Sequence, residues 1–442
     1  MSEDEKFDTP PPNIPNGNDN EETVDMYLPD YGKWAFLRKP FMIKLNLLMA
    51  ILALSSSNTG YDGSLLNSLQ VFDEWNHYMG DPSGAVLGAL NNGVVFGVLL
   101  SFAVSSTIAD RIGRKLAITL GNFIMIIGII IQSCSVDYAM FLVARIIIGV
   151  GNGIALVPSP TLVSELSYPS HRQAVTSFYN TNWYLGAIVA AWVSFGTRNR
   201  THQWCWRIPS ICQAIWPVVQ TCLIYLVPES PRWLVSKGQP EKARAILLKY
   251  HGDGNEEIGG PLVDFEMMEI AAAIEAEKIA GNYSYWDFCK TPGNRKRLFL
   301  LFCIAFAMQM SGNGLVSYYL NKVLDSIGIT SKDRKLVVNG GLMIYNFGVA
   351  MIVPAIVSKF KRRTMFLSSF TLMLITYVIW TVLSAINQKK NFEEKSLGQG
   401  VLAMIFFYYL AYNLGLNGLP YLYMTEILPF TIRAKGYRYG CN

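Results

Sequence analysis

The sequence predicts an all-α protein that crosses a membrane many times. Hydrophobic residues occupy 51% of its 442 positions and charged residues only 16%, whereas a soluble domain carries about 25% charged residues. The apolar residues gather in blocks of about 20, the length that a helix needs to cross the hydrocarbon layer. Backbone groups in lipid must bond within their own segment, so each block is expected to be a helix.

Ten apolar blocks are expected to span the bilayer. They cover Ile43–Leu66, Ala85–Ile108, Leu116–Ser133, Tyr138–Val163, Val175–Phe195, Ile208–Val227, Leu298–Leu320, Leu336–Val357, Met365–Ile386 and Gly400–Met424. A polar linker separates the sixth block from the seventh, and in it Pro240–Tyr250 and Asp264–Ala280 have helical spacing. The predicted domains are a disordered cytoplasmic tail (residues 1–40), a six-span half (41–227), the linker (228–297) and a four-span half (298–442).

The distribution of Lys and Arg predicts a cytoplasmic N-terminus, because cytoplasmic loops carry an excess of these residues. Basic residues such as Lys39, Arg111 and Lys115 flank the expected inner ends of the spans, whereas the loops at residues 67–84 and 133–137 contain none. Residues 1–25 are polar and do not resemble a signal peptide, so the first span is expected to direct insertion. A glycosylation sequon at Asn199 then faces outward, in a multi-pass protein of the plasma membrane.

Several function classes are not supported by the sequence. The seven cysteines show neither metal nor redox spacing, and all four histidines lie outside the predicted spans. The sequence contains no P-loop, dinucleotide fingerprint or hydrolase elbow. The net charge of +5 is what basic inner loops would give, and it does not indicate a nucleic-acid partner. We therefore expect no enzyme activity, no cofactor and no bound metal.

Two features repeat along the chain. Glu165 stands seven residues before Arg172 after the fourth block, and Glu426 stands seven residues before Arg433 after the tenth. A basic turn also follows the second block and again the eighth. Parallel repeats of six helices build one large class of transporters, so two halves of six spans are expected. Only ten blocks are present, and the chain is interpreted as lacking the last two.

Four motifs carry a resemblance to a known family. They are Asp110-Arg-Ile-Gly-Arg-Lys115, Arg145 with Gly149, Gly151 and Gly153, Pro228-Glu-Ser-Pro-Arg-Trp233, and the segment Glu426–Gly436. In this order and spacing they resemble the sugar porter family of the major facilitator superfamily. The segments Tyr179–Gly186 and Ser311–Tyr319 are most similar to fungal lactose-permease-like proteins. The resemblance implies a monomer with the major facilitator fold, here truncated to about ten helices. It would move a lactose-like disaccharide or a hexose across the plasma membrane by alternating access, by proton symport.

Asp62 and Arg145 are the predicted proton-coupling pair. An ionisable group within a membrane span is costly and is therefore a functional candidate. By the resemblance, Asp62 takes the position of the proton-accepting carboxylate, and Arg145 would hold it charged until a proton arrives. The alternative is that Asp62 lies at the level of the outer headgroups and is simply hydrated there.

A second set of residues is predicted to bind the sugar. Amide side chains carry both a donor and an acceptor, which suits sugar hydroxyls, and aromatic faces suit the apolar surface of the ring. By their positions relative to the family that the chain resembles, the candidates are Asn180, Gln309, Asn313, Tyr318, Asn346 and Tyr421, and Trp183 is an additional candidate. The alternative is that these side chains hold neighbouring helices together.

Charges at the inner ends of the spans form a third set. The resemblance implies ion pairs that hold the outward-facing state and break when the inner gate opens. The residues are Asp110, Arg111, Arg114, Glu165, Arg172, Glu229, Arg232, Glu426 and Arg433. The alternative is a solvated surface whose ion pairs contribute little.

Other functions remain open at this stage. A protein of the same fold could bind a sugar and signal without transporting it, facilitate diffusion without protons, or be an inactive truncated fragment. Saturable, competed uptake separates a transporter from a receptor or an inactive fragment.

Overall fold

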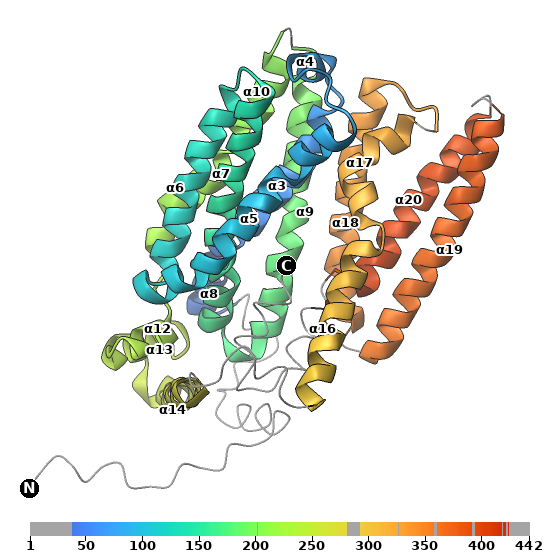
Figure 1. Cartoon of the computed structure of the whole chain (residues 1–442). Coiled ribbons are helices and arrows are strands. Elements are labelled where there is room, and N and C mark those ends of the chain that lie inside the picture. Colours follow the sequence, from blue (N-terminus) through green and yellow to red (C-terminus); the bar gives the residue numbers. More distant parts are fainter. Residues whose placement is uncertain are drawn as a thin grey trace, which may run out of the picture.

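The computed structural model describes residues 38–200, 202–280, 292–325, 327–357, 360–390, 394–417, 419–420 and 423. Within these ranges the chain forms helices and no strands, in agreement with the predicted fold class (Figure 1). The main helices are α3 (Pro40–Leu69), α4 (Asp73–Tyr78), α5 (Gly84–Ile112), α6 (Arg114–Ser133), α7 (Tyr138–Leu156), α8 (Pro158–Leu166), α9 (Arg172–Thr197), α10 (Trp204–Cys212), α11 (Ile215–Leu223), α12 (Pro231–Ser236), α13 (Pro240–Tyr250), α14 (Glu256–Ala280), α16 (Pro292–Met310), α17 (Asn313–Asp325), α18 (Lys332–Val357), α19 (Arg362–Lys389) and α20 (Lys395–Gly415).

Eight segments in the described part are long and apolar enough to cross a membrane. They correspond to eight of the ten predicted spans. The fifth predicted span is the 26-residue helix α9, whose central residues Asn180, Thr181 and Asn182 lower its hydropathy. The seventh is divided into α16 and α17, and neither part reaches the required length and hydropathy.

The helices form two groups in Figure 1. The first group, α3 to α11, packs α3 on α9 and both α5 and α6 on α7. The second group, α16 to α20, packs α19 on α20 and α18 on α20, and it meets the first group mainly where α18 lies against α9. The boundaries of the predicted domains stay predictions.

Glycines allow α5 and α7 to touch along their backbones. A Cβ atom added to Gly97 of α5 would overlap the Ile146 carbonyl of α7, and one added to Gly149 of α7 would overlap the Val94 carbonyl of α5. Small residues permit such close approach, and close packing drives helix association within a membrane. Gly97 and Gly149 therefore fix the distance between these helices.

The break between α16 and α17 lies at Ser311 and Gly312, where Gly312 has φ = 91°. A broken helix leaves backbone carbonyls without their usual partners. The Tyr408 hydroxyl donates to the Ser311 carbonyl at 3.2 Å, and the Tyr377 hydroxyl donates to the Gly312 carbonyl at 3.1 Å. Hydroxyls from α20 and α19 therefore satisfy the backbone that the break exposes.

The linker folds into short helices at one end of the first group, opposite α4 (Figure 1). Helix α13 has the predicted bounds, and α14 begins eight residues earlier than predicted, at Glu256. Arg244 of α13 contacts Glu256 at 2.6 Å and Asp264 at 3.2 Å, which holds α13 to α14. The linker is thus a small helical unit attached to the inner end predicted for the spans.

Candidate functional site

Asp62 and Arg145 form an ion pair in the interior of the first group. Arg145 donates from Nη1 to Asp62 Oδ1 at 3.3 Å and from Nη2 to Asp62 Oδ2 at 3.2 Å. Both residues are buried, with exposed fractions of 2% for Arg145 and 6% for Asp62. The structure therefore brings the two predicted residues together. It argues against a carboxylate that is simply hydrated at the outer headgroups.

Two glutamines extend this pair. Gln213 of the α10–α11 segment donates from Nε2 to Asp62 Oδ1 at 3.1 Å, and Gln132 of α6 donates from Nε2 to Gln213 Oε1 at 3.2 Å. Arg145 also donates from Nε to the Leu90 carbonyl at 2.9 Å. The carboxylate therefore accepts three hydrogen bonds from buried donors, which hold it in one orientation.

A second polar chain crosses between the two helix groups. Tyr184 of α9 donates its hydroxyl proton to Asn413 Oδ1 of α20 at 2.7 Å. Asn413 in turn donates from Nδ2 to Asn346 Oδ1 of α18 at 3.3 Å. The Asn346 amide nitrogen is fully buried and finds no acceptor among the described residues. A buried donor left without a partner is costly, and an acceptor such as a sugar hydroxyl would satisfy it.

Asn313 lies at the start of α17, directly after the helix break. Its Nδ2 donates to the hydroxyl of Tyr412 at 3.2 Å, and Tyr412 is the residue directly before Asn413 on α20. The Tyr412 ring stacks on Tyr408, with 6.2 Å between the centroids. Amides and aromatic rings from α17, α18, α20 and α9 therefore gather where the groups meet, and this composition suits a sugar.

The other predicted sugar-binding residues are less well defined. Asn180 is half-buried on α9, one turn before Trp183, whose ring packs edge-on against Tyr184 at 5.1 Å. Gln309 is exposed near the end of α16. Tyr318 belongs to α17, but its side chain lies outside the described part, and so does the whole of Tyr421.

The predicted inner-gate charges meet around the turn between α5 and α6. Arg114 lies 3.4 Å from Asp110 and 3.6 Å from Glu165 of α8. Glu229 accepts from the backbone nitrogens of Arg114 at 3.1 Å and Lys115 at 3.3–3.4 Å. A carboxylate at a helix N-terminus is stabilised by the free amides and the helix dipole. The motif therefore joins α6, α8 and the segment before α12.

Of the other predicted inner-gate charges, the structure describes some and not others. Arg111 is exposed at the end of α5, and Arg172 is half-buried at the start of α9. Arg232 is half-buried in α12. Glu426 and Arg433 lie outside the described residues. Asn199, the predicted glycosylation site, is exposed in the turn after α9.

The two groups are also joined at the end that carries α4. Lys332 of α18 contacts Asp73 of α4 at 2.7 Å, and its neighbour Asp333 contacts Arg198 at 2.6 Å. Beneath these ion pairs, Asn321 of α17 donates to the Asn67 carbonyl of α3. We call these contacts the outer mouth.

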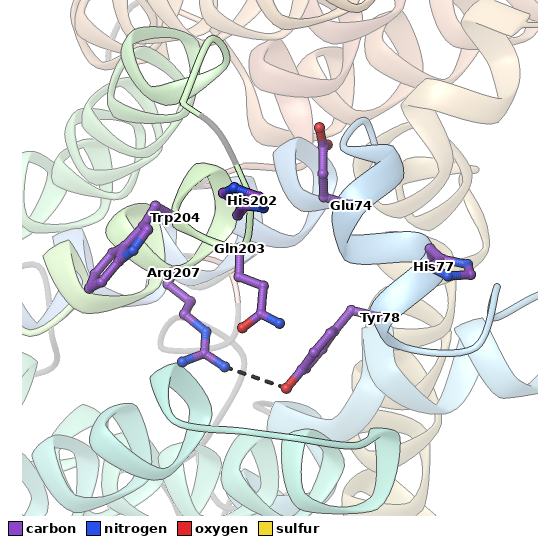
Figure 2. Close-up of a pocket in the computed structure, with 7 residues that line it drawn as sticks. All are labelled: Glu74, His77, Tyr78, His202, Gln203, Trp204 and Arg207. Atoms are coloured by element: carbon purple, nitrogen blue, oxygen red, sulfur yellow. Dashed lines mark hydrogen bonds between the residues drawn. The ribbon is translucent and has the colours of Figure 1, made fainter.

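A surface pocket of about 390 Å³ lies beside the outer mouth (Figure 2). It is lined by Glu74, His77, Tyr78, His202, Gln203, Trp204 and Arg207. Arg207 bonds to the Tyr78 hydroxyl at 3.5 Å, and His77 points away from that bond in Figure 2. None of the predicted site residues lines this pocket, so it is not the candidate sugar site.

Sequence reasoning missed several residues of the site, among them Gln213, Tyr184 and Asn413. Each is a polar side chain within an apolar block, which is a usable signal in a membrane protein. Their partners are 151 and 229 residues away in the chain, so spacing alone could not pair them.

Comparisons with known proteins identify the family of the chain. The family model described as "Sugar (and other) transporter" matches residues 48–442. The chain is 31% identical to the MFS-type transporter oryC of Aspergillus oryzae over 350 residues, which are 78% of this chain and 63% of that protein. It is 28% identical to a low-affinity glucose transporter of Kluyveromyces lactis over 369 residues, 81% of this chain and 63% of that protein. The chain thus spans about 63% of the length of these curated relatives.

Solved structures share the fold. The proton:xylose symporter XylE bound to 6-bromo-6-deoxy-D-glucose superposes with a TM-score of 0.72 at 20% identity, covering 90% of this chain and 85% of that one. A partially occluded inward-open form of XylE from E. coli gives a TM-score of 0.71 at 18% identity, covering 90% of each chain. With the family match over residues 48–442 and the motifs in their expected order, the chain belongs to the sugar porter family of the major facilitator superfamily.

Proposed function

We propose that the protein carries a sugar across the plasma membrane by alternating access and couples this movement to protons. The observation that carries the proposal is the chain from Tyr184 through Asn413 to Asn346, which ends at a buried amide donor without a described acceptor. It joins α9 of the first group to α20 and α18 of the second. A sugar that binds there contacts both groups, so its binding can favour their movement relative to each other.

The coupling site is the pair of Asp62 and Arg145. A proton on Asp62 would cancel its charge, remove the reason for the bidentate contact with Arg145 and free that side chain to move. In this scheme protonation, sugar binding, reorientation and release follow one another. Facilitated diffusion would need no titratable group at this depth, and the buried carboxylate therefore favours symport.

The substrate class is a disaccharide of the lactose type or a hexose. Tyr184, Tyr412 and Trp183 give the site large aromatic surfaces, which suit the apolar faces of sugar rings. The amides of Asn313, Asn346 and Asn413 supply paired donors and acceptors for hydroxyls. This set does not select between one ring and two.

Uptake of labelled lactose, cellobiose and glucose by this chain in a transport-null yeast tests the proposal, with surface expression and external pH recorded together. We expect saturable uptake of at least one sugar and alkalinisation of the medium. Asn346→Ala should lower the apparent affinity roughly tenfold or more, because it removes the orphaned donor and one hydrogen bond to sugar. Sugar binding without uptake would indicate a receptor, and surface expression with neither would refute the proposed function for this chain.

A further inference from the structure

The surface pocket beside the outer mouth has no role in the proposed transport. Its lining comes from two short stretches, residues 74–78 of α4 and residues 202–207 around the start of α10. Both stretches belong to the first helix group, so the walls of the pocket move together if the two groups shift. Its volume of about 390 Å³ lies within the range of small-molecule sites, roughly 300–1,000 Å³. The pocket is thus large enough for a ligand and separate from the proposed sugar site.

Arg207 gives this pocket a positive charge that no described carboxylate neutralises. Its Nη2 donates to the Tyr78 hydroxyl at 3.5 Å and to the Ser135 carbonyl at 3.3 Å, and neither partner is charged. The guanidinium also lies 5.1 Å from the ring centroid of Trp206 and forms no ion pair with any described residue. A guanidinium offers five donors in a planar fork, which suits the oxygens of a phosphate. Arg207 therefore favours an anionic group in the pocket.

A negative charge stands on the other side of the pocket. In Figure 2, Glu74 lies at the opposite end of the labelled residues from Arg207. The Glu74 carboxylate is 3.8 Å from Lys332, whose closer partner is Asp73 at 2.7 Å, and its side chain is 43% exposed. A carboxylate and aromatic faces such as that of Trp204 attract an ammonium group. The pocket therefore offers one end to an anion and the other to a cation.

The position of Trp204 places the pocket at the membrane surface. Trp204 is the first residue of a candidate span, Trp204–Leu226, and it is 57% exposed. Ile211, seven residues further along α10 and so on the same face, is 47% exposed. Exposed apolar residues of a membrane-spanning helix face lipid, and Trp is enriched at the level of the headgroups. The pocket thus borders the lipid-facing surface at headgroup depth.

We propose that this pocket binds the headgroup of a zwitterionic phospholipid. The phosphate accepts from Arg207, and the ammonium lies against Glu74 and the aromatic rings of Tyr78 and Trp204. The acyl chains then follow the lipid-facing side of α10, beside Ile211. A lipid held in this way joins α4 to α10 within one helix group, so it stays bound while the groups move relative to each other. The proposal does not depend on the proposed function.

Three lipids separate the contributions of the two charges. Phosphatidylcholine carries a phosphate and an ammonium, phosphatidic acid carries the phosphate alone, and diacylglycerol carries neither. Arg207→Gln should weaken binding of the first two roughly tenfold or more, because a charged hydrogen bond to phosphate is lost. Glu74→Gln should weaken phosphatidylcholine roughly threefold or more and leave phosphatidic acid unchanged or stronger. Arg200→Gln is the matched control, because Arg200 is exposed in the turn after α9 and does not line the pocket.

Native mass spectrometry of the full chain released from detergent micelles measures these affinities, with each lipid titrated in turn. In the wild type and in Arg200→Gln, phosphatidylcholine should bind more tightly than diacylglycerol. Equal binding of these two lipids in the wild type, or unchanged binding in Arg207→Gln, would overturn the proposal. If Arg207→Gln fails to fold, Glu74→Gln still decides, since none of the described hydrogen bonds involves the Glu74 side chain and equal loss of both phospholipids would contradict the assigned orientation.

Inorganic phosphate distinguishes a lipid from a soluble anion as the source of the phosphate group. Added in large excess to the wild type, it should leave bound phosphatidylcholine in place, because the ammonium contact and the acyl chains contribute only in the lipid. Displacement of phosphatidylcholine by inorganic phosphate, with a gain in melting temperature that Arg207→Gln lacks, would show that the pocket is a soluble-anion site and refute the lipid assignment.

Discussion

Substitution of Asp62 and Arg145, singly and together, examines the buried ion pair directly. Arg145 is almost fully enclosed and donates to both carboxylate oxygens of Asp62 and to the Leu90 carbonyl. Breaking a buried pair by removing one partner costs about 3–5 kcal/mol, because the other charge is left uncompensated. Asp62→Asn and Arg145→Met are each expected to lower the free energy of unfolding by that amount.

The double variant removes both charges, so its remaining cost has a different source. The Leu90 carbonyl loses the donor that now lies 2.9 Å away, and an unsatisfied buried acceptor costs about 1–3 kcal/mol. The double variant should therefore be more stable than either single variant, with a coupling energy of at least about 3 kcal/mol. Equilibrium unfolding in mixed micelles gives all four values.

Transport assays distinguish a loss of proton coupling from a loss of protein stability. Asp62→Asn should lose accumulation against a gradient and keep exchange of sugar across the membrane, because in the proposed symport the carboxyl proton is needed only for the net cycle. Counterflow in proteoliposomes measures exchange, and uptake with an imposed pH gradient measures accumulation. If Asp62→Asn still accumulates sugar, or if the coupling energy is below about 1 kcal/mol, the assignment of this pair is wrong.

Two further predictions concern packing and the outer mouth. Gly149→Ala should cost about 1–3 kcal/mol, because its Cβ would overlap the Val94 carbonyl, whereas Gly348→Ala, with open space around it, should leave thermal stability in detergent unchanged or raised. Equal melting temperatures would refute the close contact. Arg198→Asp should speed labelling of a Ser68→Cys reporter by up to roughly fivefold, since an exposed ion pair contributes at most about 1 kcal/mol. Adding Asp333→Arg to Arg198→Asp restores the opposite charges and should restore the wild-type labelling rate. A further increase in that rate would show that loss of the ion pair does not cause the faster labelling.

Much of the fold follows from properties that can be read one segment at a time. Length and hydropathy predict eight spans directly, and the spacing of apolar residues predicts α13 with its observed ends. The contact between Asp62 and Arg145 was predicted because a charged group in a span needs a partner, and motif resemblance provided one. Its role in coupling stays a prediction.

The rest depends on contacts that no local pattern encodes. The break at Gly312 is stable because Tyr377 and Tyr408, 65 and 97 residues from their acceptors, donate to the freed carbonyls. The residues Gly312-Asn313-Gly314 indicate that the helix can break here. Within a membrane, however, the break is stable only because these hydroxyls bond to the freed carbonyls. In the same way, Asn413 was overlooked because its partners Tyr184 and Asn346 come from different helices.

Helix α3 is the physical link between the proposed proton site and the proposed sugar site. Asp62 is two residues after Gly60, where a Cβ would overlap the Trp183 carbonyl, so α3 and α9 touch along their backbones beside Tyr184. Toward the outer mouth, Ser64 and Ser68 of the same helix accept from Asn339 of α18 at 3.3 Å. A small displacement of α3 when Asp62 loses its charge would therefore reach Tyr184 on one side and α18 on the other. Packed interfaces shift between discrete arrangements rather than deforming gradually, so such a displacement can bias which end of the sugar site is open.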